Sequence, residues 1–192
     1  MAEKTSPNFT SPIEPQQLSS FNRELKIWGR DVAIALGLAA FIIVFLYQPV
    51  KVEGTSMAPL LSDQERIFIN KYVYRFEPIH RGDVVVFWYP LDRSMSFIKR
   101  VIGLPGDTID IRAGQLYVNG EHVVEPYVPA RYFDDSTYGP IHIPPDEYFV
   151  MGDHRDSSND SRIFGPVSRK LIYGKAVFAY WPFGEFGEIS AP

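Results

Sequence analysis

Ser56, in the stretch GTSMAPLL at residues 54–61, is the first residue whose type and setting suggest chemistry. A serine hydroxyl attacks a carbonyl carbon when a neighbouring base removes its proton. Most serines in turns have no such base and simply stabilise the turn. The flanking residues do not match the Gly-x-Ser-x-Gly elbow of hydrolases, because Ala58 stands at the last glycine position. Ser56 therefore needs a base from elsewhere in the chain.

Two kinds of side chain could act as that base. Among the four histidines, His154 follows Asp153 and would complete a Ser-His-Asp triad, although neighbours in sequence usually point apart. Lys99, in SFIKRVIGLPGD, shares one face of a predicted strand with Phe97 and Val101. A buried lysine loses its preference for the charged form and can accept a proton near neutral pH. The same pattern also fits a lysine at a sheet edge, with its stem packed and its ammonium in water.

A polar segment, MGDHRDSSNDSRIFGPV at residues 151–167, is the third candidate for chemistry. A calcium loop that starts at Asp153 would have Arg155 at its third position and no glutamate at its twelfth. A zinc site lacks further histidines at suitable spacing. We interpret the segment as a hydrogen-bonded loop, with Asp and Arg paired internally, that presents a serine to a neighbouring site.

Four stretches taken in order, GTSMAPLL, RGDVVVFWYP, KRVIGLPGD and GDHRDSSNDSR followed by FGPV, resemble the motifs of the bacterial type I signal peptidases. These are serine-lysine endopeptidases of the membrane. The resemblance runs from an apolar N-terminal segment to about Val167, and the ordered set is far more specific than any one motif. The chain departs from the family pattern at Leu60, where threonine is usual. It also has Gly54 where some members carry a serine that helps to form the oxyanion hole.

The resemblance implies a role for each matching residue. Ser56 would be the nucleophile, its backbone N–H an oxyanion donor, and Lys99 the general base. Ser158 would hydrogen-bond the lysine amine and orient it. Structural support is implied for four charged residues: Arg100, Asp153, Asp160 and Arg162. The implied reaction removes N-terminal signal peptides from secreted precursors by cutting after small residues of the Ala-x-Ala type, without a metal or cofactor.

Two other functions remain open from the residues. One is a different Ser-Lys protease of similar fold, such as a self-cleaving repressor, although no DNA-binding domain is evident. The other is a membrane-anchored binding domain in which Ser56 and Lys99 are incidental and lie apart. The net charge of −4 lacks the excess of positive charge that is typical of nucleic-acid-binding proteins. The absence of cysteine excludes disulfides, cysteine nucleophiles and thiolate metal sites.

Short strands must position these residues. Aromatic residues make up 15% of the chain, and 16 Pro and 14 Gly favour many strands joined by turns. Strand candidates, each bounded by Gly, Pro or Asp, lie at 65–74, 82–90, 96–104, 108–123, 147–153 and 175–183. The Asn-Gly pair within Leu116–Val123 predicts a hairpin. We expect a mainly β fold, either an antiparallel sheet or a partly closed barrel, with few helices beyond the N-terminal segment.

The uncharged segment 32–50 predicts one transmembrane helix, with Tyr47 at the far interface and Pro49 at its end. It lacks the polar face of a core helix, and no small-x-small cleavage site follows it as in a removed signal peptide. Basic residues gather before the span, which predicts a cytoplasmic tail at 1–31. This tail is expected to be largely disordered, because residues 1–20 are rich in Ser, Pro, Thr and Gln. Residues 51–192 would then form an extracytoplasmic peptidase domain.

The expected partners are secretory precursors and a lipid bilayer, and we expect a monomer. The membrane would be the plasma or inner membrane, with another energy-transducing membrane such as the thylakoid as the alternative. The short stretch between Asp107 and Gly152 leaves room for a small insertion beside the core, which predicts a short member of the family.

Overall fold

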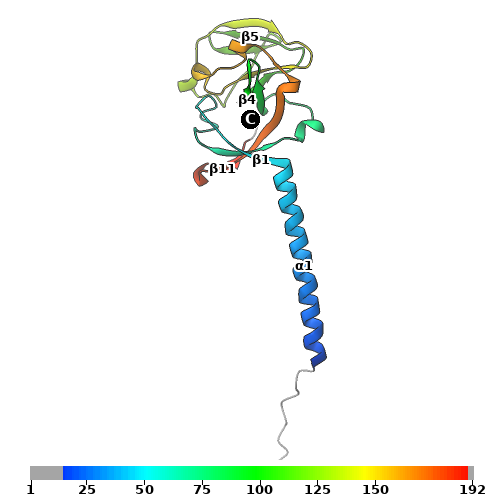
Figure 1. The fold of residues 1–192 in the computed structure, drawn as a ribbon. Helices are drawn as coiled ribbons and strands as arrows, with labels where there is room; N and C mark the ends of the chain where they lie inside the picture. Colours follow the sequence, from blue (N-terminus) through cyan, green and yellow to red (C-terminus); the bar gives the residue numbers. More distant parts are fainter. Residues whose placement is uncertain (1–14, 190–192) are drawn as a thin grey trace, which may run out of the picture. The chain divides into compact units, whose positions relative to one another are not determined.

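The computed structural model describes residues 15–189, and for residues 15–22 and Ile42 it describes the backbone alone. The chain divides into two units, one up to Val44 and one from Phe45 onward. The described part of the first unit is helical and belongs to helix α1 (Pro15–Leu46), whose last two residues are part of the second unit. The second unit also holds the strands (Figure 1).

Helix α1 contains the apolar segment. Its part from Arg23 to Leu46 is long and apolar enough to cross a membrane, with a mean hydropathy of 2.1 and 0% of its apolar window buried in protein. The helix begins at Pro15, so residues 15–31 of the predicted tail are helical in this structure. The earlier part of the predicted tail lies outside the described residues.

The end of the apolar segment also differs from the expectation. Helix α1 stops at Leu46 rather than at Pro49, because Tyr47–Lys51 form strand β1 and pair with strand β2 (Arg66–Asn70). Proline is tolerated here because β1 is an edge strand and needs no donor on its free side. Residues 47–50 therefore belong to the sheet and not to the helix.

The larger sheet has eight strands in the order β1-β2-β11-β3-β4-β9-β10, with β12 paired to β11. The further strands are β3 (Val84–Tyr89), β4 (Asp92–Gly103), β9 (Glu147–Met151), β10 (Val167–Ser168), β11 (Ile172–Trp181) and β12 (Gly187–Glu188). All of its pairings are antiparallel, which confirms the predicted fold class. The terminal strands β1 and β10 do not pair within the described residues, so the sheet is open and a partly closed barrel is wrong.

A smaller antiparallel sheet has the order β7-β6-β5-β8. Its strands are β5 (Thr108–Arg112), β6 (Gln115–Val118), β7 (Glu121–His122) and β8 (Tyr138–His142). Asn119 and Gly120, with φ of 54° and 85°, form the turn between β6 and β7, which confirms the predicted hairpin. Figure 1 shows β5 in this sheet and β4 and β11 in the larger one.

Short helices connect several strands. They are η1 (Val73–Arg75), η2 (Ala130–Tyr132), η3 (Arg155–Ser157), α2 (Ser161–Phe164), η4 (Arg169–Leu171) and η5 (Phe183–Glu185). The sequence did not predict β1, β8, β10 or β12. These strands are short, and β1 and β8 contain proline, so they lack the pattern by which longer strands are recognised.

Apolar side chains of β3 and β4 pack on both sides of the larger sheet. On one side Val84 and Val86 join a cluster that includes Ile67, Ile69 and residues of the turn after β1. On the other side Val85 and Val101 pack with Phe87, Val150 and Val167. The middle of β4 is therefore enclosed, and any polar residue on it loses contact with water.

Candidate active site

The turn that carries Ser56 is fixed to the protein core. The side chains of Met57 and Leu61, which follow Ser56, are buried to 1% and 0% exposure in the apolar cluster beside β2. Gly54 adopts a φ of +90°, and its N–H donates to Asp63 Oδ1 over 2.8 Å. Because both flanks of the turn are held, the Ser56 hydroxyl has a defined position.

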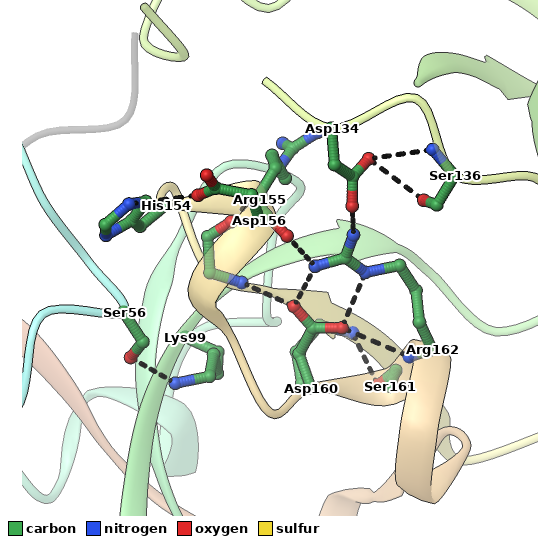
Figure 2. A network of polar contacts seen from close by, with 12 residues as sticks. Ser56, Lys99, Asp134, Ser136, His154, Arg155, Asp156, Asp160, Ser161 and Arg162 are labelled. Carbon is green, nitrogen blue, oxygen red and sulfur yellow. Dashed lines mark hydrogen bonds and ion pairs between the residues drawn. The ribbon is translucent and has the colours of Figure 1, made fainter. Parts of the chain in front are cut away.

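Lys99 extends from β4 toward this turn. Lys99 is only 4% exposed. Its Nζ lies 2.6 Å from Ser56 Oγ (Figure 2) and 3.0 Å from the Ile98 carbonyl oxygen. The Phe97 ring centroid lies 5.4 Å from the same amine. Among the described residues, no carboxylate forms an ion pair with Lys99. The alternative of an incidental serine and lysine that lie apart is therefore wrong.

Burial changes the protonation of this lysine. Loss of solvation lowers the pKa of Lys99 to about 8, although the negative charges of Asp160 and Asp153 act in the opposite direction. A substantial fraction of the amine is therefore neutral in mildly alkaline solution. A neutral Nζ at 2.6 Å can accept a hydrogen bond, and then a proton, from Ser56 Oγ.

An open cleft of about 870 Å³ runs past the serine and the lysine. One wall comes from residues 50–56, and the other from residues 94–99 of β4. Strand β1 is an edge of the larger sheet, and β9 pairs with β4 only from Arg100 onward. Backbone groups on both walls are therefore free to pair with an added extended chain.

Arg100 and Asp153 form a buried ion pair below the site. Arg100 Nε and Nη2 donate to Asp153 Oδ1 and Oδ2 over 2.8 and 2.6 Å, and the side chains are 1% and 0% exposed. Arg100 also donates to the Gly82 carbonyl oxygen over 3.0 Å and lies 4.2 Å from the Tyr127 ring centroid. This pair joins β4 to the loop that follows β9.

Asp160 and Arg162 hold the other end of that loop. Asp160 caps α2 by accepting from the Arg162 N–H (Figure 2). Asp160 Oδ2 also accepts from the Gly152 N–H over 3.1 Å. Arg162 Nη2 donates to Asp160 Oδ2 over 2.8 Å and to the Arg155 carbonyl oxygen over 2.7 Å. Burial alone would raise the pKa of Asp160, yet the hydrogen bonds and charge of Arg162 hold it below its ordinary value. Asp160 is therefore a permanent anion in this loop.

The loop contacts the backbone of the serine turn. His154 N–H donates to the Ser56 carbonyl oxygen over 3.1 Å. A Cβ on Gly152 would lie 2.4 Å from that same oxygen and 2.3 Å from Ser158 Oγ, distances that no real side chain accepts. Glycine is thus required at position 152 because the loop packs directly against Ser56.

His154 lies near the serine but does not face its hydroxyl. Its Nδ1 lies 3.1 Å from the Thr55 carbonyl oxygen, and its Nε2 lies 3.0 Å from Asp156 Oδ1. Both ring nitrogens thus have partners other than Ser56 Oγ, and the Asp153 carboxylate is bound to Arg100. The Ser-His-Asp arrangement is therefore not assembled in this structure.

Ser158 is near the site, but its expected hydrogen bond to the lysine is not made. Its buried Oγ forms no hydrogen bond of good geometry within the part of the chain that the structure describes. It points toward Gly152, and the backbone of Ser158 is extended, with φ of −137° and ψ of 124°. The hydroxyl instead interacts with the Asp160 carboxylate and helps to lower its pKa.

Sequence reasoning missed a second buried ion pair. Arg155 Nη1 and Nη2 donate to the two carboxylate oxygens of Glu125, each over 2.6 Å, and Arg155 Nε donates to the Gly152 carbonyl oxygen over 3.0 Å. Tyr127 hydroxyl donates to Glu125 Oε1 over 2.5 Å. Arg155 lies within the polar motif and could have been suspected, whereas Glu125 sits in a loop without any motif.

Potential metal ligands do not gather in the described residues, since no group of three or more His, Asp or Glu side chains could hold an ion there. The carboxylates near the site are bound to arginines instead.

A serine hydroxyl against a buried lysine, beside a cleft with free strand edges, is compatible with a serine peptidase. The family described as "Signal peptidase, peptidase S26" matches residues 25–181. Signal peptidase I of Bacillus amyloliquefaciens is 41% identical over 82% of this chain and 89% of its own length. Signal peptidase I of Leptolyngbya laminosa is 34% identical over 98% of this chain and 94% of its own.

The chain therefore belongs to the bacterial type I signal peptidases of family S26, serine peptidases that remove signal peptides from secretory precursors. A crystal structure of a signal peptidase I from Enterococcus faecalis, 32% identical, covers 52% of this chain and 97% of that one, with a TM-score of 0.47. The predicted family and enzyme class are confirmed.

Proposed function

We propose that Ser56 is the nucleophile of this signal peptidase and that Lys99 is its general base. The observation that carries the proposal is the 2.6 Å contact between Ser56 Oγ and a buried Lys99 amine with a pKa lowered to about 8. The amine lacks a carboxylate partner among the described residues, so it can become neutral without breaking an ion pair.

The reaction follows in two stages. Neutral Lys99 accepts the Ser56 proton while Oγ attacks the peptide carbonyl carbon, and the leaving amine then takes that proton as the acyl ester forms. Water attacks the ester with Lys99 again as base, which releases the signal peptide and restores Ser56. The Ser56 N–H, which has no hydrogen-bond partner among the described residues, donates to the oxyanion.

The loop residues support this pair. Asp153, Asp160, Arg100 and Arg162 fix the loop that contacts the Ser56 backbone. Ser158 orients the base, and its hydroxyl, which interacts with the Asp160 carboxylate in this structure, becomes available to the Lys99 amine once one of the two side chains rotates. The position that carries a serine in some members is Gly54, and its N–H is already bound to Asp63.

The substrate is an extended segment of a precursor. It adds between the free edge of β1 and the free part of β4, with backbone hydrogen bonds to either wall. Small residues of the Ala-x-Ala type precede the cut. Apolar cleft residues such as Val86 and Ile98 give shallow walls that suit such residues.

The enzyme acts at a membrane. The apolar part of α1 spans the bilayer once, with the N-terminus in the cytoplasm and the strand unit outside, because Arg23, Lys26 and Arg30 precede the most apolar residues. The plasma or inner membrane is the proposed location, and the protein acts there as a monomer.

The test is cleavage of a secretory precursor by the detergent-solubilised full chain. Ser56→Ala and Lys99→Ala are each expected to lower the rate by about 10³-fold or more, because neither group can replace the other. Matched controls are Ser62→Ala, an exposed serine of the same turn region, and Lys170→Ala, an exposed lysine, which should keep near wild-type rates.

His154→Ala separates the two candidate bases. The variant keeps the backbone N–H that contacts Ser56, so more than about a tenth of the activity should remain. If Lys99→Ala cleaves normally while His154→Ala does not, the lysine is not the base and the histidine mechanism replaces it.

A further inference from the structure

A second pocket of about 400 Å³ lies in the strand unit. Three basic side chains, Lys71, Arg75 and Arg169, line it together with aromatic residues that include Tyr72 and Tyr173. The reaction proposed above uses none of these basic residues.

The positive charges of this pocket are not neutralised. Among the described residues, no carboxylate forms an ion pair with Lys71, Arg75 or Arg169. Arg75 lies 4.8 Å from the Tyr72 ring centroid, and Arg169 donates to the carbonyl oxygens of Tyr74 and Ile172 over 2.6 and 3.2 Å. Those two bonds leave Arg169 with three further N–H donors, and Lys71 has all three of its own. The pocket therefore offers several charge-assisted donors to an anion.

A neighbouring carboxylate does not cancel these charges. Asp83 accepts from the Tyr74 hydroxyl over 3.0 Å, but it already forms an ion pair with Lys175 over 2.6 Å. The Asp83 charge is thus balanced by a lysine outside the pocket.

The pocket lies beside the point where the apolar helix ends. Lys71 N–H donates to the carbonyl oxygen of Leu46, the last residue of α1, over 3.4 Å. Phe76, which follows Arg75, is 86% exposed. Basic and aromatic residues next to the end of a membrane span lie at the depth of lipid headgroups, where phosphate groups are concentrated.

We propose that this pocket binds the phosphate of an anionic membrane lipid headgroup through Lys71, Arg75 and Arg169. Arginine suits this ligand because its planar fork donates two parallel hydrogen bonds to phosphate oxygens, while lysine adds a point charge. The inference rests on the proposed membrane placement and is independent of the roles of Ser56 and Lys99.

The pocket shares one lining residue with the substrate cleft. Tyr173 lines both the pocket and the cleft, and its ring stacks on Trp88 with centroids 4.6 Å apart. A bound headgroup therefore contacts a residue of the cleft wall, which connects lipid binding to the surface that receives the precursor.

The experiment measures lipid binding to the full chain in a neutral detergent by native mass spectrometry. The probes are short-chain phosphatidylglycerol, phosphatidylcholine with the same acyl chains, and glycerol 3-phosphate. We expect one molecule of phosphatidylglycerol to bind at saturation, about ten-fold more tightly than phosphatidylcholine. Glycerol 3-phosphate should bind far more weakly, because a free phosphate gains nothing from the adjacent apolar phase.

Arg75→Gln and Arg131→Gln form a matched pair of variants. Each arginine is exposed, lies in a 3-10 helix and is 4.8 Å from the ring centroid of an adjacent tyrosine, but Arg131 is not in the pocket. Arg75→Gln should weaken phosphatidylglycerol binding about five- to twenty-fold, and Lys71→Gln should weaken it further in the double variant. Arg131→Gln should leave the affinity unchanged.

Three results would overturn the proposal. They are equal binding of the two phospholipids, equal loss in Arg75→Gln and Arg131→Gln, and binding of glycerol 3-phosphate as tightly as the lipid. The last result would assign the pocket to a soluble phosphate compound. Because cleavage is not measured, a failure of this inference is distinct from a failure of the serine-lysine mechanism.

Discussion

Lys99 and Arg100 are neighbours on β4, and both are almost completely buried. They differ in their partners, because a carboxylate forms an ion pair with Arg100 but, among the described residues, not with Lys99. Arg100 meets a carboxylate in a two-fold hydrogen-bonded ion pair and also binds a carbonyl oxygen and a tyrosine ring. Lys99 meets a serine hydroxyl, a carbonyl oxygen and an aromatic ring, with no carboxylate paired to it among the described residues.

The contrast separates a structural charge, Arg100, from the charge that we propose to be reactive, Lys99. A buried guanidinium keeps its proton and therefore requires an anion, which fixes the position of the loop that carries Asp153. A buried ammonium without an anion is destabilised and loses its proton easily. Because side chains alternate along a strand, the Lys99 amine of β4 points toward the turn that carries Ser56, and the Arg100 guanidinium points toward the loop that carries Asp153.

The largest expected effect on stability comes from removing the partner of Arg100. Asp153→Asn leaves a buried guanidinium without an anion, and the free energy of unfolding should fall by about 3–5 kcal/mol. Denaturant unfolding of the full chain in detergent measures the change. Asp156→Asn is the control, because Asp156 pairs with His154 but its side chain is 50% exposed, and it should change the free energy by less than about 0.5 kcal/mol. Similar values for both variants would mean that the buried pair has no special role.

The pH dependence of cleavage tests the reactive charge. With a Lys99 pKa of about 8, kcat/KM should rise about ten-fold per pH unit below that value and level off above it. Between pH 6 and pH 8 the expected gain is on the order of 50-fold. A peptide substrate without titratable groups near the cut is suitable for the measurement. A flat profile from pH 6 to pH 9 would contradict a lysine base.

The stability of Lys99→Met should change in the opposite direction to that of Asp153→Asn. Methionine removes a desolvated ammonium, so the free energy of unfolding should rise by about 1–3 kcal/mol below pH 8. The pKa of Lys99 is lowered from 10.5 to about 8 in the folded protein, so between these values the unfolded chain binds more protons and wild-type stability increases with pH. The advantage of Lys99→Met should therefore disappear as the pH approaches 10.5. A loss of stability at pH 7 would show that the lysine is a structural charge like Arg100.

Ser158→Ala should give the smallest effect. Its hydroxyl makes no hydrogen bond of good geometry among the described residues and interacts weakly with the Asp160 carboxylate, so the free energy of unfolding should fall by less than about 1 kcal/mol. Loss of one orienting hydrogen bond to the amine should lower kcat by about two- to ten-fold and move the midpoint of the pH profile. Ser157→Ala, at the neighbouring exposed serine, is the control. If Ser157→Ala lowers kcat as much as Ser158→Ala, position 158 does not orient the base.

Prediction from the sequence succeeded where a residue pattern has a direct physical meaning. Apolar and aromatic segments bounded by Gly, Pro or Asp located β3, the core of β4 and β11, and the Asn119-Gly120 turn located the hairpin of β6 and β7. Prediction failed for β1, because Pro49 and a continuous apolar run favoured a helix end there. Pairing with β2 decides the conformation of those residues, and that pairing is not local.

In the site, too, the residue types were predictable from the sequence, whereas contacts between distant residues were not. The ordered motifs were sufficient to name Ser56 and Lys99 as candidates, since only a few residue types can be a nucleophile or a base. The Glu125–Arg155 pair had no sequence signal, because its two residues come from separate loops and meet only in the fold. The Ser158 hydroxyl was expected to bind the lysine amine and instead lies against Gly152, since a rotamer depends on local packing.

The sequence by itself determined the family, the mainly β character of the second unit, the apolar N-terminal helix and the residues able to do chemistry. These properties depend on composition, period and motif order, which the chain carries locally. Only the tertiary structure decided that the lysine is buried and unpaired while the adjacent arginine is paired, and that two free strand edges border one cleft. Those properties depend on which residues distant in sequence share the space around β4, and on how much water that packing removes.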